Sequence, residues 1–307
     1  MYNQDLASNM LFHRKSFIAL SIGALFILSP TLAIAQPVQQ SSLAPSSEVK
    51  NITPNDNFSL KYNLTRTGLN LMKLKFNISL KGDQYRASHS LKSKGLIKIF
   101  ADTNSKASVE GKIKKGFLSP TSFQISAEKK DKTKTAKLSW EGEKFTQELS
   151  PKLSDDRAKK LAPLLKPDLK DPLSGLLSVV MFDNPEKPCG KTIRVFEGRK
   201  IFELSYTYLE TGKLQKSDPG SFRGDTHICQ VKHTPIAGYS DKKMKKLLEA
   251  NLSHKIWVAR IKSPKGKQSY FVPVKMQLGT KYGVIDVELD KGKINGKKLR
   301  KAAISLP

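Results

Sequence analysis

The sequence predicts a mainly β protein, built as a single curved antiparallel sheet or barrel-like domain of about eleven strands with two short helices. Three observations predict this fold. Apolar and polar residues alternate with a period of two along much of the chain, turn residues separate these runs, and only two segments carry a helical period. Short turns between alternating runs are typical of antiparallel hairpins. A sheet with one apolar face must then curl, pair with another sheet or pack on helices.

The N-terminus predicts a secretory signal peptide over residues 1–35. Arg14 and Lys15 precede an apolar run over residues 17–28, and Ala33-Ile34-Ala35 forms a small-residue cleavage site. Ser29-Pro30 ends the apolar run well short of the roughly 20 residues that a membrane-spanning helix needs. We therefore expect cleavage after Ala35, no transmembrane anchor in the mature protein, and export, most simply to the periplasm of a Gram-negative bacterium.

Three segments follow the signal peptide. Residues 36–55 are rich in Gln, Ser and Pro and predict a flexible leader, because so few large apolar groups cannot offset the entropy of ordering. Residues 56–290 form a β-rich domain of unknown function, and residues 291–307 form a basic C-terminal tail. The proline-containing stretch 151–170 is read either as a domain linker or as an internal crossover. We favour the crossover, because neither half alone offers enough strands to protect its edges.

Alternation of apolar and polar residues marks each predicted strand. In the second strand the apolar side chains Met72, Leu74 and Phe76 alternate with polar ones such as Lys73 and Lys75, so one face is core and the other is solvated. The eleven runs are 58–64, 72–80, 85–91, 108–113, 122–127, 137–140, 193–196, 201–209, 255–261, 270–278 and 282–289.

Two segments predict helices. Asp171-Pro172 places an N-cap acceptor before a proline at the first helical position, and apolar residues follow at i, i+3, i+4 and i+7, which predicts a helix packed in the core. These apolar residues are Leu173, Leu176, Leu177 and Val180. Ser240-Asp241 begins a second, lysine-rich amphipathic helix of about ten residues. Such a helix can lie on anionic lipid, but we favour a surface helix that seals one end of a barrel.

The pattern of these and later residues carries a family resemblance. It consists of Asp171 to Ser174, Cys189, the string Val195 to Lys200, Cys229 followed by Pro235, Trp257 to Arg260, and Tyr270 to Val274. This order and spacing resembles the bacterial family catalogued as domain of unknown function 3108, over roughly residues 58–289. Glu197 and Lys200 depart mildly from the family pattern, which has Asp and Arg there. The resemblance implies an exported β-rich envelope protein and no known activity. It implies structural roles for the motif residues Asp171, Pro172, Leu173, Gly198, Arg199, Trp257 and Pro273.

The chain has two cysteines, Cys189 and Cys229. Exported proteins meet an oxidising environment, so the pair predicts a disulfide, with a pair of free buried thiols as the alternative. Closing the intervening loop should stabilise the fold by about 3.9 kcal/mol in the chain-entropy model. Neither cysteine has the C-x-x-C neighbour of a redox or zinc motif.

Motifs for catalysis and for cofactors are missing from the sequence. There is no nucleophile elbow, no H-E-x-x-H and no glycine-rich phosphate loop, so we predict a non-catalytic protein without a cofactor. His89 falls on the apolar face of its strand and is read as a core histidine. Asp225, His227 and His233 share one strand parity and could ligate a transition metal, but the spacing is unspecific and we assign no metal.

The charge is strongly positive: 54 Lys and Arg residues stand against 27 Asp and Glu, a net charge of +27. Only nine of the basic residues are Arg, which favours diffuse surface charge over a designed readout face. Export and the lack of aromatic residues among the basic runs argue against nucleic acid. The runs 242–246 and 291–301 would attract anionic lipid or wall polymer, and a lysine-rich composition without function is the alternative.

Two hypotheses about the function, from different classes of protein, fit these observations. The first is a non-catalytic envelope protein that binds an unidentified envelope component, which could be anionic lipid, wall polymer or a partner protein. The second is a lipid or acyl-chain carrier with a half-barrel cavity, which requires an accessible interior of several hundred Å³ rather than a filled core.

Overall fold

A computed structural model describes residues 54–94, 103–114, 116–129, 132–142, 144–180, 188–250, 252–266, 268–280 and 282–306. The predicted signal peptide and all but the last two residues of the leader lie outside the described residues. The chain divides into two units, Met1–Val49 and Lys50–Pro307, and every described residue belongs to the second unit. Within the described ranges, no helix is both long enough and apolar enough to cross a membrane.

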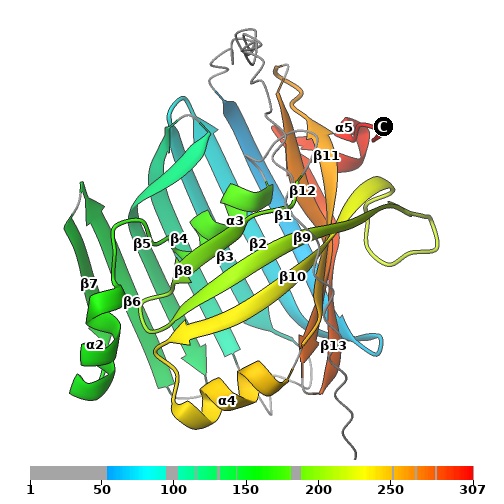
Figure 1. The fold of residues 1–307 in the computed structure, drawn as a ribbon. Helices are drawn as coiled ribbons and strands as arrows, with labels where there is room; N and C mark the ends of the chain where they lie inside the picture. The colour runs from blue at the N-terminus through cyan, green and yellow to red at the C-terminus, as the bar shows by residue number, and fades with distance from the viewer. Residues whose placement is uncertain are drawn as a thin grey trace, which may run out of the picture. The chain divides into compact units, whose positions relative to one another are not determined.

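The described residues form a single antiparallel sheet with short helices, as predicted (Figure 1). The strands of the N-terminal half are β1 Asn55–Arg66, β2 Leu69–Lys81, β3 Gln84–Ser93, β4 Thr103–Lys114, β5 Phe117–Lys129, β6 Lys132–Glu141 and β7 Lys144–Ser150. Those of the C-terminal half are β8 Thr192–Phe196, β9 Ile201–Leu214, β10 Gly224–Ala237, β11 His254–Lys262, β12 Ser269–Thr280, β13 Gly283–Ile294 and β14 Lys297–Lys298. The helices are α2 Asp155–Leu161, the 3-10 turn Ala162–Leu164, α3 Pro172–Val180, α4 Asp241–Glu249 and α5 Leu299–Ala302.

The sheet consists of two meanders, β1 to β7 and β8 to β13. They are joined by pairing between β1, the first strand, and β13, near the end of the chain. The order of the sheet is β7-β6-β5-β4-β3-β2-β1-β13-β12-β11-β10-β9-β8, and β14 pairs with β13. The central pair β1–β13 joins the start of the domain to its end, with Phe58 opposite Ile294. Strand β13 therefore continues four residues past the domain boundary predicted at 290. The segment between β7 and β8 is an internal crossover that links the two edges of the sheet.

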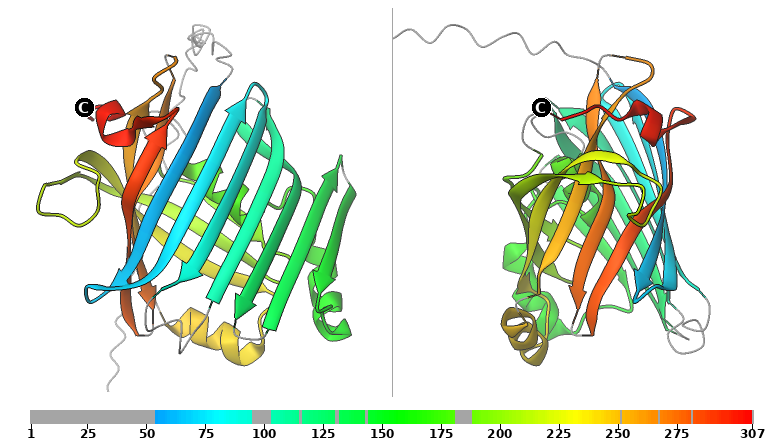
Figure 2. Two further views of the ribbon diagram at one scale, coloured as in Figure 1. Left: turned by 180° about the vertical axis from the view of Figure 1, so that it is seen from behind. Right: turned by 90° about the vertical axis from the view of Figure 1, so that its right-hand side faces the viewer.

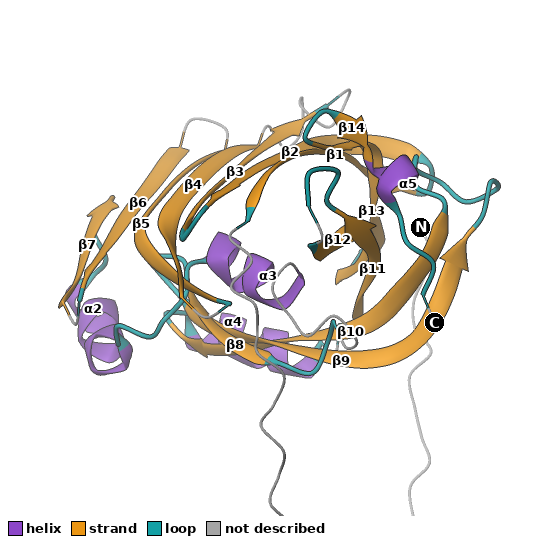
Figure 3. Cartoon of the chain, turned by 90° about the horizontal axis from the view of Figure 1, so that it is seen from above, coloured by secondary structure: helices purple, strands orange, loops and turns teal. Residues whose placement is uncertain are grey.

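The sheet curls around α3, which lies inside the curve (Figure 3). This helix contacts strands from both meanders: β3, β4, β5, β8 and β12. Gly175 lets α3 lie close to β8, because a Cβ at this position would stand 3.0 Å from the Val195 side chain. The core therefore consists of the inward-facing side chains of the sheet packed on one central apolar helix. Its largest fully buried members include Tyr62, Tyr85, Tyr270, Phe196 and Leu80.

The predicted number of strands is wrong, since the sheet contains fourteen rather than eleven. The three extra strands are β7, β10 and β14. Strand β7 is an exposed edge with only Phe145 and Leu149 half-buried, β14 has two residues, and β10 mixes polar and apolar residues on both faces. Both predicted helices are present as α3 and α4, whereas α2 and α5 carry no apolar period that would have predicted them.

Candidate functional site

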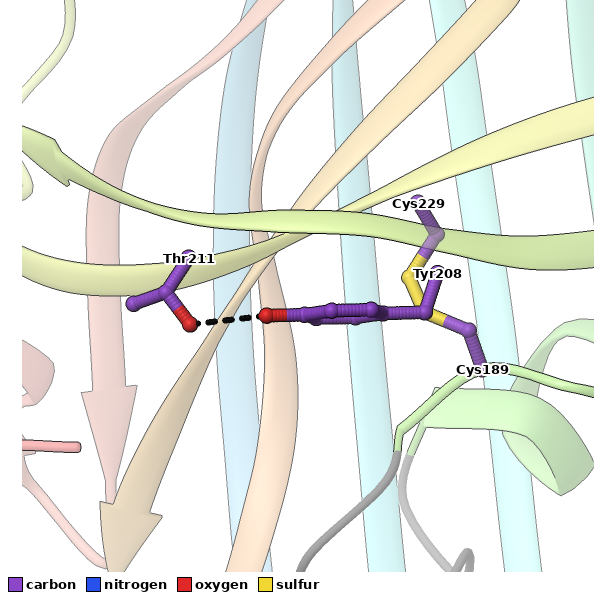
Figure 4. Close-up of a disulfide and its surroundings, with 4 residues drawn as sticks. All are labelled: Cys189, Tyr208, Thr211 and Cys229. Carbon is purple, nitrogen blue, oxygen red and sulfur yellow. Dashed lines mark hydrogen bonds between the residues drawn. A yellow bond between two sulfur atoms is a disulfide. The ribbon is translucent and has the colours of Figure 1, made fainter. Parts of the chain in front are cut away.

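A disulfide joins Cys189 to Cys229, as predicted, with the two Cα atoms 6.2 Å apart (Figure 4). Cys189 ends the crossover just before β8, and Cys229 lies on β10. Strand β9 pairs with both β8 and β10, so the disulfide spans β9. On β9, the Tyr206 carbonyl accepts a 2.8 Å hydrogen bond from the Gly190 amide. The covalent bond therefore anchors the end of the crossover at the edge of the sheet where strand pairing ends.

Asp171 caps α3 from inside the core. Its Oδ1 atom accepts hydrogen bonds from the amides of Leu173 and Ser174, at 2.9 and 3.0 Å, and Pro172 occupies the first helical position, where no amide hydrogen is needed. Burial raises the pKa of the Asp171 carboxyl to about 6, although these hydrogen bonds oppose the shift. The Ser174 hydroxyl lies 2.7 Å from the Tyr85 hydroxyl, which ties the helix to β3.

Gly198 and Arg199 join the two edges of the sheet without strand pairing. They belong to the turn between β8 and β9, which lies against β6 and β7. The backbone of Gly198 has φ +94°, and a Cβ there would stand 2.5 Å from the Ala136 Cβ. Arg199 Nη2 donates to the carbonyls of Ser150 at 2.8 Å and Pro151 at 2.7 Å, where β7 ends. The guanidinium therefore links the β8–β9 turn to the backbone at the end of β7.

Trp257 and Pro273 stand on the paired strands β11 and β12. The register shifts between Trp257 and Val258, so Val258 pairs with Pro273 and Trp257 with Lys275. Proline has no amide hydrogen, which suits it to such a bulge. The Pro273 carbonyl accepts a 2.8 Å hydrogen bond from the buried Tyr62 hydroxyl, and the Lys275 ammonium lies 5.3 Å from the centre of the Trp257 ring. These family positions therefore shape the sheet.

The interior beside α3 is nearly filled. A cavity of about 20 Å³ remains between α3 and the strands β1, β2, β3 and β12. This space has room for about one water molecule. Its walls are apolar and include Leu60, Tyr62, Phe76, Leu176 and Met276. The central helix therefore occupies the volume that an acyl chain would need.

The N-terminal meander turns its outer face away from α3 (Figure 2, left). Two open hollows of about 540 and 460 Å³ lie side by side and share Asn77, Ser88 and Ser108. These residues stand directly opposite one another on β2, β3 and β4, and the row continues to Ser59 on β1 and Gln124 on β5. Directly opposed residues share one face of a sheet. We call this polar row and the two hollows above it the outer trough.

Lysines flank the outer trough on one side. Lys75 and Lys106 line one hollow with exposed side chains and stand in the next row of the sheet, on either side of Ser90. No ion pair joins either lysine to a carboxylate in the described part of the chain. Lys137, at the end of the trough on β6, is paired with Glu148 at 3.6 Å. The trough therefore combines hydroxyl and amide groups with unpaired positive charge.

Residues 57–290 match the family described as "Protein of unknown function (DUF3108)". The chain belongs to this family. The match covers β1 to β13, and the resemblance drawn from the sequence motifs is confirmed. Among solved structures, the chain is similar to a beta-barrel-like protein of domain of unknown function DUF1849 from Brucella abortus, with a TM-score of 0.39 and 10% identity, over 78% of this chain and 97% of that chain. No curated protein matches the chain.

The three weak metal candidates of this DUF3108 domain do not form a site. His227 lies between the rings of Tyr208 and Phe271, at 5.7 and 5.4 Å between centroids. His233 instead lies 4.9 Å from the Phe202 ring, and Asp225 stands opposite Lys213 on β9. No group of three or more His, Cys, Asp or Glu side chains that could hold a metal ion occurs among the described residues.

His89 is half-buried on β3, with its Nε2 atom 3.3 Å from the Ser105 hydroxyl and its ring 5.9 Å from the Phe76 ring. Burial lowers the pKa of this imidazole. The contacts are those of a packed side chain at the border of the core.

Sequence reasoning missed the outer trough, because the alignment of short polar side chains across four strands depends on the pairing register.

Proposed function

We propose that this protein is an exported, non-catalytic envelope protein that binds an anionic glycan through its outer trough. The observation that carries the proposal is the continuous row of hydroxyl and amide side chains from Ser59 to Gln124, at the base of hollows of about 540 and 460 Å³. Such groups can exchange hydrogen bonds with sugar hydroxyls along an extended chain.

The unpaired lysines supply the charge preference. Lys75 and Lys106 place two ammonium groups beside the trough, and the chain as a whole carries a net charge of +27. Ammonium groups attract carboxylate or phosphate groups along a polymer, with an affinity that falls as salt screens the charges. A linear, acidic polysaccharide of the cell wall therefore has the chemistry that this surface fits best.

Two features support export. The sequence begins with a signal-peptide pattern that ends at Ala35, and the disulfide between Cys189 and Cys229 is of a kind that persists in oxidising compartments. The periplasm of a Gram-negative bacterium satisfies both features. The carrier alternative has less support, because the cavity beside α3 holds about 20 Å³ and an acyl chain needs several hundred.

Co-sedimentation with isolated peptidoglycan sacculi tests the proposal. We expect the mature protein to pellet with sacculi at low salt and to be released at high salt. The variant Lys75→Ala/Lys106→Ala should lose about fivefold in affinity, since an exposed ion pair contributes roughly 0.2 to 1 kcal/mol and the two lysines together about 1 kcal/mol.

The matched control is Lys112→Ala/Lys114→Ala. Both residues are exposed, and neither lines the trough. The control removes the same charge from the sheet and should bind sacculi as the unchanged protein does. Equal losses in the two variants would show that binding depends only on net charge and would contradict a role for the trough.

A further inference from the structure

One end of the sheet, which we call the α4 rim, gathers three turns or helices from distant parts of the chain. It consists of the β1–β2 hairpin around residues 66–69, the β12–β13 turn around 280–284, and α4 (Figure 1, bottom). The hairpin and the turn adjoin, because a Cβ at Gly283 would stand 3.7 Å from Arg66 Nε. The connection from α4 to β11 reaches the turn through a 3.0 Å hydrogen bond from the Gly279 amide to the Ser253 carbonyl.

Exposed apolar side chains concentrate on the α4 rim. Eight large hydrophobic residues are exposed in the described part of the chain, and five of them stand here. They are Leu69, Leu248, Leu278, Tyr282 and Val284. Leu69 is 69% exposed directly after the hairpin turn, and Leu248 on α4 is 59% exposed. Most of the exposed large apolar side chains of the described residues thus stand at one end of the sheet, which favours an interaction surface there.

Helix α4 adds positive charge to these apolar groups. It has no buried residue, its apolar side chains Met244 and Leu247 are only half-buried, and four lysines stand among its nine residues. Asp241 and Glu249 are its two acids, and Glu249 lies 3.9 Å from Lys245. Burial and then the nearby Lys200 and Lys134 lower the pKa of Lys243, with Glu197 opposing them, so positive charge extends from the helix to neighbouring strands.

We propose that the α4 rim docks onto an anionic phospholipid bilayer. Leucine and tyrosine side chains at turn tips can enter the boundary between headgroups and acyl chains, while lysines meet the anionic headgroups. Charge complementarity favours this partner. A protein partner for apolar side chains beside a lysine-rich helix would need both an apolar surface and an acidic one, whereas an anionic leaflet offers both layers at once. The outer trough lies on the side of the sheet and stays accessible in this arrangement.

Vesicle flotation measures this docking. The probe is a vesicle of phosphatidylcholine with about 30 mol% phosphatidylglycerol, compared with phosphatidylcholine alone. We expect the mature protein to float with the anionic vesicles at about 50 mM salt and to bind at least about tenfold less at about 500 mM. The variant Leu69→Ser/Leu248→Ser should bind the anionic vesicles about tenfold less than the unchanged protein.

Phe117 supplies a matched control. It is 69% exposed, like Leu69, but stands in the β4–β5 turn at the opposite end of the sheet. Phe117→Ser should leave flotation unchanged. A second readout uses Tyr282→Trp and Phe117→Trp, where only the tryptophan at position 282 should show blue-shifted emission with anionic vesicles. Equal loss in Phe117→Ser, or emission that does not change at position 282, would overturn the proposal.

The experiment also separates the α4 rim from the outer trough and from other partners. Lys75→Ala/Lys106→Ala should float with vesicles as the unchanged protein does, and Leu69→Ser/Leu248→Ser should still bind sacculi. Failure of one proposal therefore leaves the other measurable. If the unchanged protein does not float but dimerises in size-exclusion chromatography, and the leucine variant abolishes the dimer, the rim is a contact between copies and the lipid proposal is wrong.

Discussion

Asp171 is a fully buried carboxyl group that caps the central helix through one of its two oxygens. Burial raises its pKa to about 6, above the ordinary value of 3.8. The folded protein therefore binds this proton more readily than the unfolded chain does. The stabilisation from the protonated carboxyl is complete below about pH 4 and is lost as the pH rises through 6.

The variant Asp171→Asn tests this pH dependence. Asparagine keeps an oxygen that can accept the two amide hydrogen bonds but carries no charge. We expect the free energy of unfolding of the unchanged protein to fall by up to about 2 kcal/mol more than that of the variant between pH 4.5 and 7.5. Urea unfolding at several pH values measures the difference. Parallel pH profiles for the two proteins would contradict the assignment.

Gly198 combines a left-handed backbone with a contact that has no room for a side chain. Gly198→Ala should lower the free energy of unfolding by about 3 to 4 kcal/mol, since strain at positive φ adds to overlap with the Ala136 Cβ. Gly116 has φ +79°, and a Cβ at this position would meet nothing within 4 Å, so Gly116→Ala isolates the strain alone. We expect about 1 to 2 kcal/mol for this control. If urea unfolding gave equal losses of free energy for the two variants, the contact between the β8–β9 turn and β6 would not be tight enough to resist a methyl group.

At the scale of elements, the disulfide anchors the crossover to the sheet. Reduction should lower the melting temperature by roughly 8 to 16 °C, which corresponds to about 3.9 kcal/mol in a domain of this size. Cys189→Ser and Cys229→Ser should destabilise alike, and the double variant should cost little more than either, because all three remove one bond. Calorimetry measures these shifts. Additive losses would indicate two independently packed side chains.

Elements with a clear period were predictable from the sequence, and those without one were not. Strands β1 and β2 alternate so regularly that their ends fall within a few residues of the prediction. Strand β10 was expected around His227 and His233 but was not among the eleven alternating runs, because four consecutive residues, 226–229, are buried, which hides the alternation. Helix α2 has no buried stripe, yet Ser154 followed by Asp155 and Asp156, with Lys159 and Lys160 in its last turn, is a detectable signal.

The two candidate surfaces required different information. The alternation of polar and apolar residues along each strand predicts that the outer face is polar. The outer trough exists because Ser59, Asn77, Ser88 and Ser108 stand opposite one another, and this depends on the register of three strand pairs, β1–β2, β2–β3 and β3–β4. The α4 rim required the topology, since β1 and β13 pair only in the folded sheet. Sequence reasoning identified the basic amphipathic helix but could not place the exposed Leu69 and Tyr282 beside it.

At the scale of the whole molecule, export carries a prediction of its own. If the signal peptide is removed after Ala35, the mature chain begins at Gln36. Intact-mass spectrometry of protein recovered from the periplasm should show loss of residues 1–35. A mass that retains these residues would contradict cleavage after Ala35.

The central β1–β13 pair has a consequence for the order in which the chain folds. Hairpins within each meander form between neighbours, whereas Phe58 and Ile294 meet only after the entire domain is available. As the chain is synthesised, β1 therefore emerges long before its partner and exposes an unpaired edge. A chain cut short before residue 283 would keep that edge, together with the edge of β12, and would be prone to join other chains through them. Strand β13, the last long strand to arrive, is thus the one that protects the first from aggregation.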